Sequence, residues 1–257
     1  MMLADAIIAN KAWIGGAVFA ALFIAERLAP AALAPRGKSR LLRNAGLWLL
    51  LTALSPSIVL PLTSLAAEHP LWSRPRQFDG LTLLADLIVL DFWAYWVHRA
   101  YHEIAPMRRL HRVHHLDEHL DTTSAVRFHP GEVALSAVLR MAPIALLAIP
   151  FSHVVIFETA LLAASFFHHS NVRLPRTIEK AAASIIVTPS IHWVHHHAVP
   201  ADTNSNYAAI LSVWDRVFGT RSPTRRTPDM KIGLQGVEDK SLSGLLCAPF
   251  EKKMEVR

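Results

Sequence analysis

Long apolar segments recur along the first two thirds of the chain, and they restrict its fold more strongly than any other feature. A helix of about 20 apolar residues crosses the hydrocarbon core of a bilayer, where the backbone must satisfy its own hydrogen bonds. The segments approach or reach that length and cover residues 12–30, 44–66, 81–97, 133–151 and 153–167. The sequence therefore predicts an all-α integral membrane helical bundle with about four to five membrane segments.

The first apolar segment, residues 12–30, could also be a secretory signal peptide. No basic region precedes it and no clear small-residue cleavage site follows, so we interpret it as a membrane helix. The loop after it is basic, with Arg36, Lys38, Arg40 and Arg43. Cytoplasmic loops carry an excess of such residues, so this loop is expected on the cytoplasmic side and residues 1–80 are expected to form N-terminal transmembrane helices.

The later segments determine which face carries the polar residues. Pro56 and Pro61 predict a kink or break in the second segment. The segments 133–151 and 153–167 are short and are separated by Pro150, which predicts a tight hairpin or a re-entrant pair. Either arrangement leaves the histidine-rich stretches and the polar, basic tail of residues 221–257 on the cytoplasmic face.

Composition excludes several kinds of site. Cys247 is the single cysteine, which excludes an intrachain disulfide framework, a cysteine-ligated zinc site and a thiolate-bound iron–sulfur cluster. The net charge of +6 and the pI near 9.8 would suit nucleic acid, but the basic residues flank apolar segments in a chain that is 52% hydrophobic. That pattern is typical of a membrane surface, so no nucleic-acid partner is predicted.

Histidines are concentrated in three groups whose members would share one face of a helix, since residues three and four apart are neighbours on a helical surface. Imidazole nitrogens bind transition metals, and three such groups in a short chain favour more than one metal ion over isolated structural histidines. The groups therefore predict a histidine-rich helical metal-binding cap on the cytoplasmic side of the bundle. The groups are His98 and His102; His111, His114 and His115; and His192, His195 and His196.

Residues near these groups are candidates for further ligands or for orienting the histidines. Asp91 shares a helical face with His98 and could accept the second ring N–H of a metal-bound histidine on another helix. Neighbouring residues on a helix lie about 100° apart, so only one of the two histidines in HHSN is expected to face the metals, and His169 is preferred over His168.

Other candidates lie in later loops and helix starts. The RFHPGE stretch supplies Arg127, His129 and Glu132, of which His129 is a candidate ligand. The helix expected after Thr188 turns His197 away from the other histidines, and no partner can be assigned to the intramembrane Asp86 and Glu158. The remaining candidates are Asn171, Asp202 and Asn206.

The stretches HRAYH, HRVHH, RFHP, HHSN, HWVHH and NYA…WDRVFGT together resemble the fatty acid hydroxylase and sterol desaturase superfamily, in order, over roughly residues 85–220. The resemblance implies a catalytic domain at residues 81–220 with a non-haem di-iron centre at the cytoplasmic face, which itself performs the O2-dependent hydroxylation or desaturation of a lipid. The chain has Ala208 where the family usually has the glycine of NYG. The implied iron ligands are His98, His102, His111, His114, His115, His169, His192, His195 and His196.

The same resemblance implies a lipid substrate, which is fatty acyl, sterol-like or another membrane lipid. The short loops suggest a compact enzyme of bacterial type, so a multi-pass location in a bacterial inner membrane is expected. Because no internal redox group is evident, two electrons would come from an external ferredoxin or cytochrome with its reductase. Hydroxylation is preferred over desaturation. The alternatives are a zinc hydrolase, although HRAYH lacks the glutamate of HExxH, and a non-enzymatic metal-binding or transport protein, although transporters place their ligands near the bilayer midplane.

Overall fold

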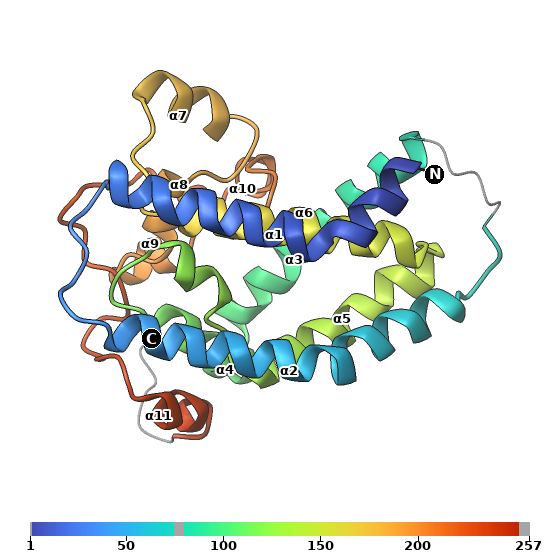
Figure 1. Ribbon diagram of the computed structural model, residues 1–257, viewed down its shortest axis with the longest axis horizontal. Coiled ribbons are helices and arrows are strands. Elements are labelled where there is room, and N and C mark those ends of the chain that lie inside the picture. The colour runs from blue at the N-terminus through green and yellow to red at the C-terminus, as the bar shows by residue number, and fades with distance from the viewer. Residues whose placement is uncertain (1, 75–79, 252–257) are drawn as a thin grey trace.

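The computed structural model describes residues 2–74 and 80–251 and contains helices and isolated bridges but no β-strand within those ranges (Figure 1). The loop expected between the second and third apolar segments is described only as far as residue 74. Five long helices dominate: α1 (Met2–Leu28), α2 (Ser39–Glu68), α3 (Gly80–Glu103), α5 (Pro130–Leu147) and α6 (Phe151–His169).

These five helices are long and apolar enough to cross a membrane, which confirms the predicted membrane helical bundle. The two short apolar segments form a helical hairpin, α5 and α6, and Ala148 at the turn adopts a left-handed conformation with φ 51°. At 1.5 Å per residue each hairpin helix is about 27 Å long, close to the thickness of the hydrocarbon core. Helix α2 continues through Pro56 and Pro61, so neither proline breaks it.

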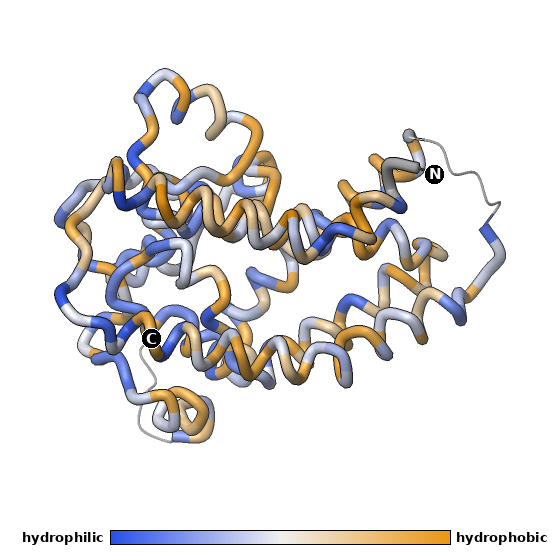
Figure 2. The backbone as a smooth tube through the Cα atoms, viewed as in Figure 1, coloured by the Kyte–Doolittle hydropathy of each residue, from blue (hydrophilic) through white to orange (hydrophobic). Residues whose placement is uncertain are grey.

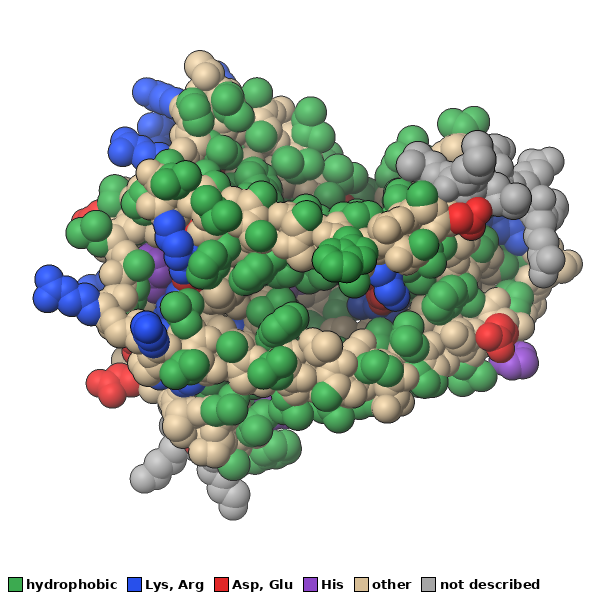
Figure 3. All heavy atoms as spheres, in the orientation of Figure 1, with side chains coloured by type: hydrophobic (Ala, Val, Ile, Leu, Met, Phe, Trp, Pro, Cys, Tyr) green, Lys and Arg blue, Asp and Glu red, His purple; other side chains and the backbone are tan. Residues whose placement is uncertain are grey.

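Short helices form a polar cap on one end of the bundle, at the left of Figure 1. Hydrophilic residues gather in this cap, whereas the outer faces of α1 and α2 are covered mostly by hydrophobic side chains (Figures 2 and 3). The cap elements are α4 (Ala105–His115), η1 (Thr122–Val126), α7 (Arg176–Ala183), α8 (Pro189–His195), α9 (Pro200–Thr203), α10 (Val213–Val217), α11 (Leu242–Cys247) and η2 (Ala248–Phe250).

Buried ion pairs attach the membrane helices to the cap. Arg40, in the first turn of α2, donates to the Asp117 carboxylate at 2.9 Å and also to Asp121. Glu26, near the end of α1, accepts hydrogen bonds from the backbone N–H and the hydroxyl of Thr122 at 3.0 and 2.9 Å. Burial alone would raise the pKa of Asp117, but the nearby guanidinium groups of Arg40 and Arg127 hold it below its ordinary value.

Replacing Asp117 by alanine is expected to lower the free energy of unfolding by about 3–5 kcal/mol, because it leaves the buried Arg40 without its main counter-charge. Since the folded-state pKa of Asp117 is lowered, its stabilising effect is present above its unfolded pKa and is lost as the pH falls through the folded pKa. Thermal unfolding in detergent measures the change. Lys240→Ala is the control, because it breaks a more exposed ion pair with Glu251. It is expected to lower the free energy of unfolding by no more than about 1 kcal/mol.

The segment predicted as a polar, basic tail packs against the cap as far as residue 251, where the described residues end. Leu245 of α11 lies in a hydrophobic cluster with Leu47 of α2 and Val113 of α4. Asp239 forms ion pairs with Arg43, at 2.6 Å, and with Arg127. The sequence did not reveal this packing because the apolar residues of the segment are few and its partners are distant in the chain.

Candidate metal centre

The structure brings all nine histidines named as ligands into two adjoining groups at the junction of bundle and cap. Within each group, one nitrogen from every residue lies within 4.8 Å of the others. The five-histidine group contains His98, His102, His111, His115 and His195. The four-histidine group contains His114, His169, His192 and His196.

Helix geometry explains how neighbouring residues come to serve different groups. His114 and His115 are consecutive at the end of α4, and His195 and His196 are consecutive at the end of α8. Consecutive residues point about 100° apart, so each helix end supplies one imidazole to each group. Helix α8 begins at Pro189 as predicted, although the Thr188 hydroxyl bonds to Glu179 and does not cap the helix.

Oxygen acceptors determine which nitrogen faces each group. A carbonyl or carboxylate oxygen only accepts, so the Nδ1 atom beside it must carry the proton and the Nε2 atom must carry the lone pair. Five histidines are held in this way: His98 by the Tyr207 carbonyl at 2.8 Å, His111 by the Glu132 carboxylate at 2.6 Å, His114 by the Arg127 carbonyl at 3.1 Å, His169 by the Ser165 carbonyl at 2.8 Å and His195 by the Ser205 carbonyl at 2.7 Å.

The unprotonated nitrogens then face one another. The Nε2 atoms of His98 and His111 are 3.2 Å apart, and those of His114 and His169 are 3.0 Å apart. Two lone pairs cannot hydrogen-bond, so each pair is satisfied only by a cation. Nitrogens bound to one ion at about 2.1 Å lie about 3 Å apart, so these spacings fit metal coordination.

Buried nitrogens without partners support the same interpretation. Four buried ring nitrogens of the five-histidine group have no hydrogen-bond partner among the described residues: Nε2 of His102, Nε2 of His195 and both ring nitrogens of His115. Burial, with a smaller contribution from neighbouring imidazoles, holds the pKa of His115 and of His196 well below the ordinary value. The neutral ring is the form that binds metal, so this donor set fits transition-metal ions such as iron.

Two residues of the RFHPGE stretch orient histidines of the two groups. Glu132 of α5 accepts from His111, and its backbone carbonyl accepts the Tyr101 hydroxyl at 2.9 Å. The fully buried side chain of Arg127 donates to the Val113 carbonyl at 3.0 Å and pairs with Asp239. These contacts hold the backbone carbonyl of Arg127 against His114. The sequence drew attention to this stretch but favoured His129.

His129 and Asp91 have other roles. His129 caps α5: its Nδ1 accepts from the Gly131 N–H at 3.0 Å and its Nε2 donates to the Leu246 carbonyl. The Asp91 carboxylate accepts from the Ile210 and Leu211 N–H groups, both at 3.0 Å, and from the Trp214 indole. Neither residue contacts a grouped histidine through these bonds, and neither belongs to a histidine group. Asp91 instead shapes the loop that follows Tyr207.

Asn171 and Asn206 are also structural. The Asn171 side chain exchanges two hydrogen bonds with the backbone of Ala32, at 3.0 and 2.8 Å, and so joins the α1–α2 loop to the end of α6. Asn206 has φ 52°, and its amide donates to the Ile191 carbonyl. Asparagine tolerates this left-handed conformation. The fully buried Ala208 is not among the residues with a positive φ, so its backbone conformation does not require glycine.

His168 and Asp202 lie near the grouped histidines but belong to neither group. The His168 ring centroid is 4.2 Å from that of His192 in the four-histidine group, so His168 packs on that ring. The Asp202 carboxylate accepts from His197 Nδ1 at 2.7 Å and does not bond to any of the nine histidines. His197 thus lies outside both groups, as the helical face predicts.

Replacing His197 by alanine is therefore expected to reduce activity by less than about threefold, since it removes one part-buried bond to Asp202 and no group member. Activity and metal content of the purified variant provide the measurement. If His197→Ala lost as much metal as His196→Ala, the exclusion of His197 from the two histidine groups would be incorrect.

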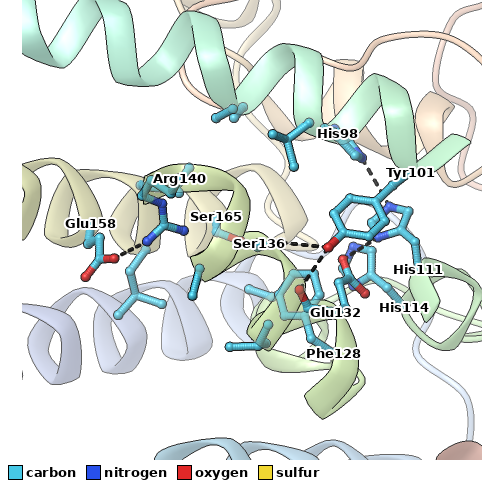
Figure 4. A pocket seen from close by; sticks show the side chains of 18 of the residues that line it. His98, Tyr101, His111, His114, Phe128, Glu132, Ser136, Arg140, Glu158 and Ser165 are labelled. Atoms are coloured by element: carbon cyan, nitrogen blue, oxygen red, sulfur yellow. Dashed lines mark hydrogen bonds and ion pairs between the residues drawn. The ribbon is translucent and has the colours of Figure 1, made fainter. Parts of the chain in front are cut away.

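A cavity of about 380 Å³ adjoins both groups and extends between the membrane helices. Figure 4 shows His98, His111 and His114 in its wall beside Tyr101 and Phe128. Its other walls are mostly apolar and come from α2, α3, α5 and α6. A second cavity of about 300 Å³ reaches the five-histidine group from the cap and is lined by the arginines of α4: Arg108, Arg109 and Arg112.

Comparisons with known proteins give the family. The chain is 30% identical to an ornithine lipid hydroxylase of Rhizobium tropici over 70% of its own length and 54% of that protein. It is 35% identical to an alkylglycerol monooxygenase of Danio rerio over 52% of its length and 29% of that protein. It is 26% identical to a Delta(7)-sterol 5(6)-desaturase of Aspergillus fumigatus over 58% of its length and 42% of that protein.

The chain spans about half or less of these relatives, and no solved structure matches it. A sequence model of the fatty acid hydroxylase family matches residues 83–220, more than half of the chain, and this range includes all nine grouped histidines. The chain belongs to the fatty acid hydroxylase family.

Proposed function

We propose that this protein is a membrane-bound lipid hydroxylase that uses O2 and holds two iron ions, one in the five-histidine group and one in the four-histidine group. The observation that carries the proposal is that two groups of histidines, all buried except the partly buried His98, share a wall with an apolar cavity between membrane helices. The relatives named as lipid hydroxylases, monooxygenases and a desaturase support it.

When bound, the iron ions would supply the oxidation of an unactivated C–H bond by O2. The chain itself orients the ligands through Glu132 and the backbone carbonyls, and its cavity holds the hydrocarbon part of the substrate away from water. Hydroxylation inserts one oxygen atom of O2 into the C–H bond and releases the other as water, which consumes two electrons and two protons.

The electrons would come from a separate carrier, since Cys247 is the only cysteine and the described residues hold no cysteine-based redox site. We propose that this carrier acts from the cytoplasm, because the α1–α2 loop at the capped end contains Arg36 and Lys38. The histidines lie at this end of the bundle, whereas the sites of many transporters lie near the bilayer midplane. This position favours an enzyme over a transport route.

Lipid analysis after growth in heavy-isotope O2 tests the function. A host that expresses the chain should accumulate a lipid with one labelled oxygen atom, and a His114→Ala host with equal protein should not. A product that lacks two hydrogens and gains no oxygen would identify desaturation instead. No altered lipid from iron-loaded protein supplied with a reductant would overturn the proposal.

A further inference from the structure

An ion pair lies in the wall of the larger cavity, within the membrane-spanning part of the protein. Arg140 of α5 and Glu158 of α6 join their side chains across the hairpin, and both line the cavity (Figure 4). The side chain of Arg140 is 20% exposed and that of Glu158 is 30% exposed, so the protein does not fully enclose the pair. In the close-up the pair lies well apart from His98 and His111, at the other end of the residues drawn.

The pair lies deep in the bundle. Arg140 is ten residues beyond Pro130, where α5 begins, and Glu158 is eleven residues before His169, where α6 ends. At 1.5 Å per residue, the pair is about 15 Å from the histidine end of the hairpin, near the middle of a hydrocarbon core of about 30 Å. Ionisable residues at such depth are costly and characteristically line a cavity or a path for a ligand.

The hydrogen bonds of the pair leave room for a further partner. A guanidinium has five N–H donors, and Glu158 is the only residue within the described ranges that accepts one from Arg140. Most of the surrounding cavity wall is apolar. A purely hydrocarbon ligand would leave the remaining donors unsatisfied, whereas a ligand with an acceptor at this depth would satisfy them.

We propose that the Arg140–Glu158 pair binds an uncharged polar group of the substrate, such as a hydroxyl, ester or amide, and thereby sets its distance from the oxidised carbon. The charges of the pair already balance, so a neutral group adds no unpaired charge inside the membrane. The volume of about 380 Å³ suits a single hydrocarbon chain. The identity of the oxidised carbon rests on the proposed function, but the binding of the polar group does not.

Competition binding tests the proposal with two ligands of equal chain length, 1-hexadecanol and hexadecane, on detergent-purified protein. Wild type should prefer the alcohol by about tenfold or more, as expected for a hydrogen bond to a charged group. Arg140→Met/Glu158→Leu should bring the two affinities to near parity and retain hexadecane binding. Arg99→Met/Glu103→Leu is the matched control, because it removes an Arg–Glu pair on α3 whose residues do not line the cavity.

Equal binding of the two ligands to wild type would overturn the proposal, whatever the folding of the variant. An alcohol preference that persists in Arg140→Met/Glu158→Leu would do the same. Stronger binding of palmitate than of the alcohol, lost in this variant, would show that the pair recognises a charged group and would also contradict the proposal. Iron content measured on the same samples reports separately on the proposed function, since neither residue belongs to a histidine group.

Discussion

Replacing His196 by alanine is expected to lower lipid oxidation by more than about 100-fold. The substitution leaves three imidazoles in the four-histidine group, and even loss of a residue that only orients a ligand typically costs 10–100-fold in metal affinity or activity. His195→Ala should be equally inactive through the other group, although four imidazoles remain there. Product formation in membranes with matched protein levels provides the measurement.

These two variants have a control in the next residue, since His197 belongs to neither group. A series of alanine substitutions through positions 195, 196 and 197 should therefore give two inactive proteins followed by a nearly normal one. Full activity of His195→Ala or of His196→Ala would contradict the assignment of these two residues to the histidine groups. All three should still insert in membranes, because the apolar helices are unchanged.

Glu132→Leu is expected to weaken metal binding by about 10–100-fold, because it removes the oxygen that accepts from His111 Nδ1 at 2.6 Å and fixes which nitrogen faces the group. Glu132→Gln should have a smaller effect, since its amide oxygen still accepts a hydrogen bond but carries no charge. The backbone carbonyl that binds Tyr101 is the same in both variants.

Competition with a chelator measures this loss, and activity on the same samples should fall in the same order. Glu103→Gln, at an exposed carboxylate paired with Arg99, is the control and should bind metal as wild type does. Wild-type metal affinity in Glu132→Leu would show that the carboxylate does not orient His111 in the loaded protein.

Local patterns predicted the features that depend on neighbouring residues. Apolar segments of spanning length predicted the membrane helices. Helical spacing predicted that His192, His195 and His196 act together, and all three lie in the two histidine groups. The same spacing excluded His197. The division of His195 and His196 between two groups was not predicted, because it depends on where α3, α4 and α6 place the other histidines.

Features that depend on distant residues were missed. Four of the five acceptors that orient histidines are the backbone carbonyls of Arg127, Ser165, Ser205 and Tyr207, which side-chain identity does not indicate. Asp91 was a reasonable partner for a histidine, but its carboxylate is occupied by the backbone of a loop about 120 residues away in the chain. The Arg140–Glu158 pair likewise exists only because the hairpin brings the two helices together.

Metal content of the detergent-purified protein, measured by elemental mass spectrometry, tests the central claim most directly. The two histidine groups predict two iron ions per chain, falling to about one in both His195→Ala and His196→Ala, with His197→Ala unchanged. One zinc ion per chain, or no bound metal after reconstitution with ferrous iron, would contradict the assignment of a di-iron centre.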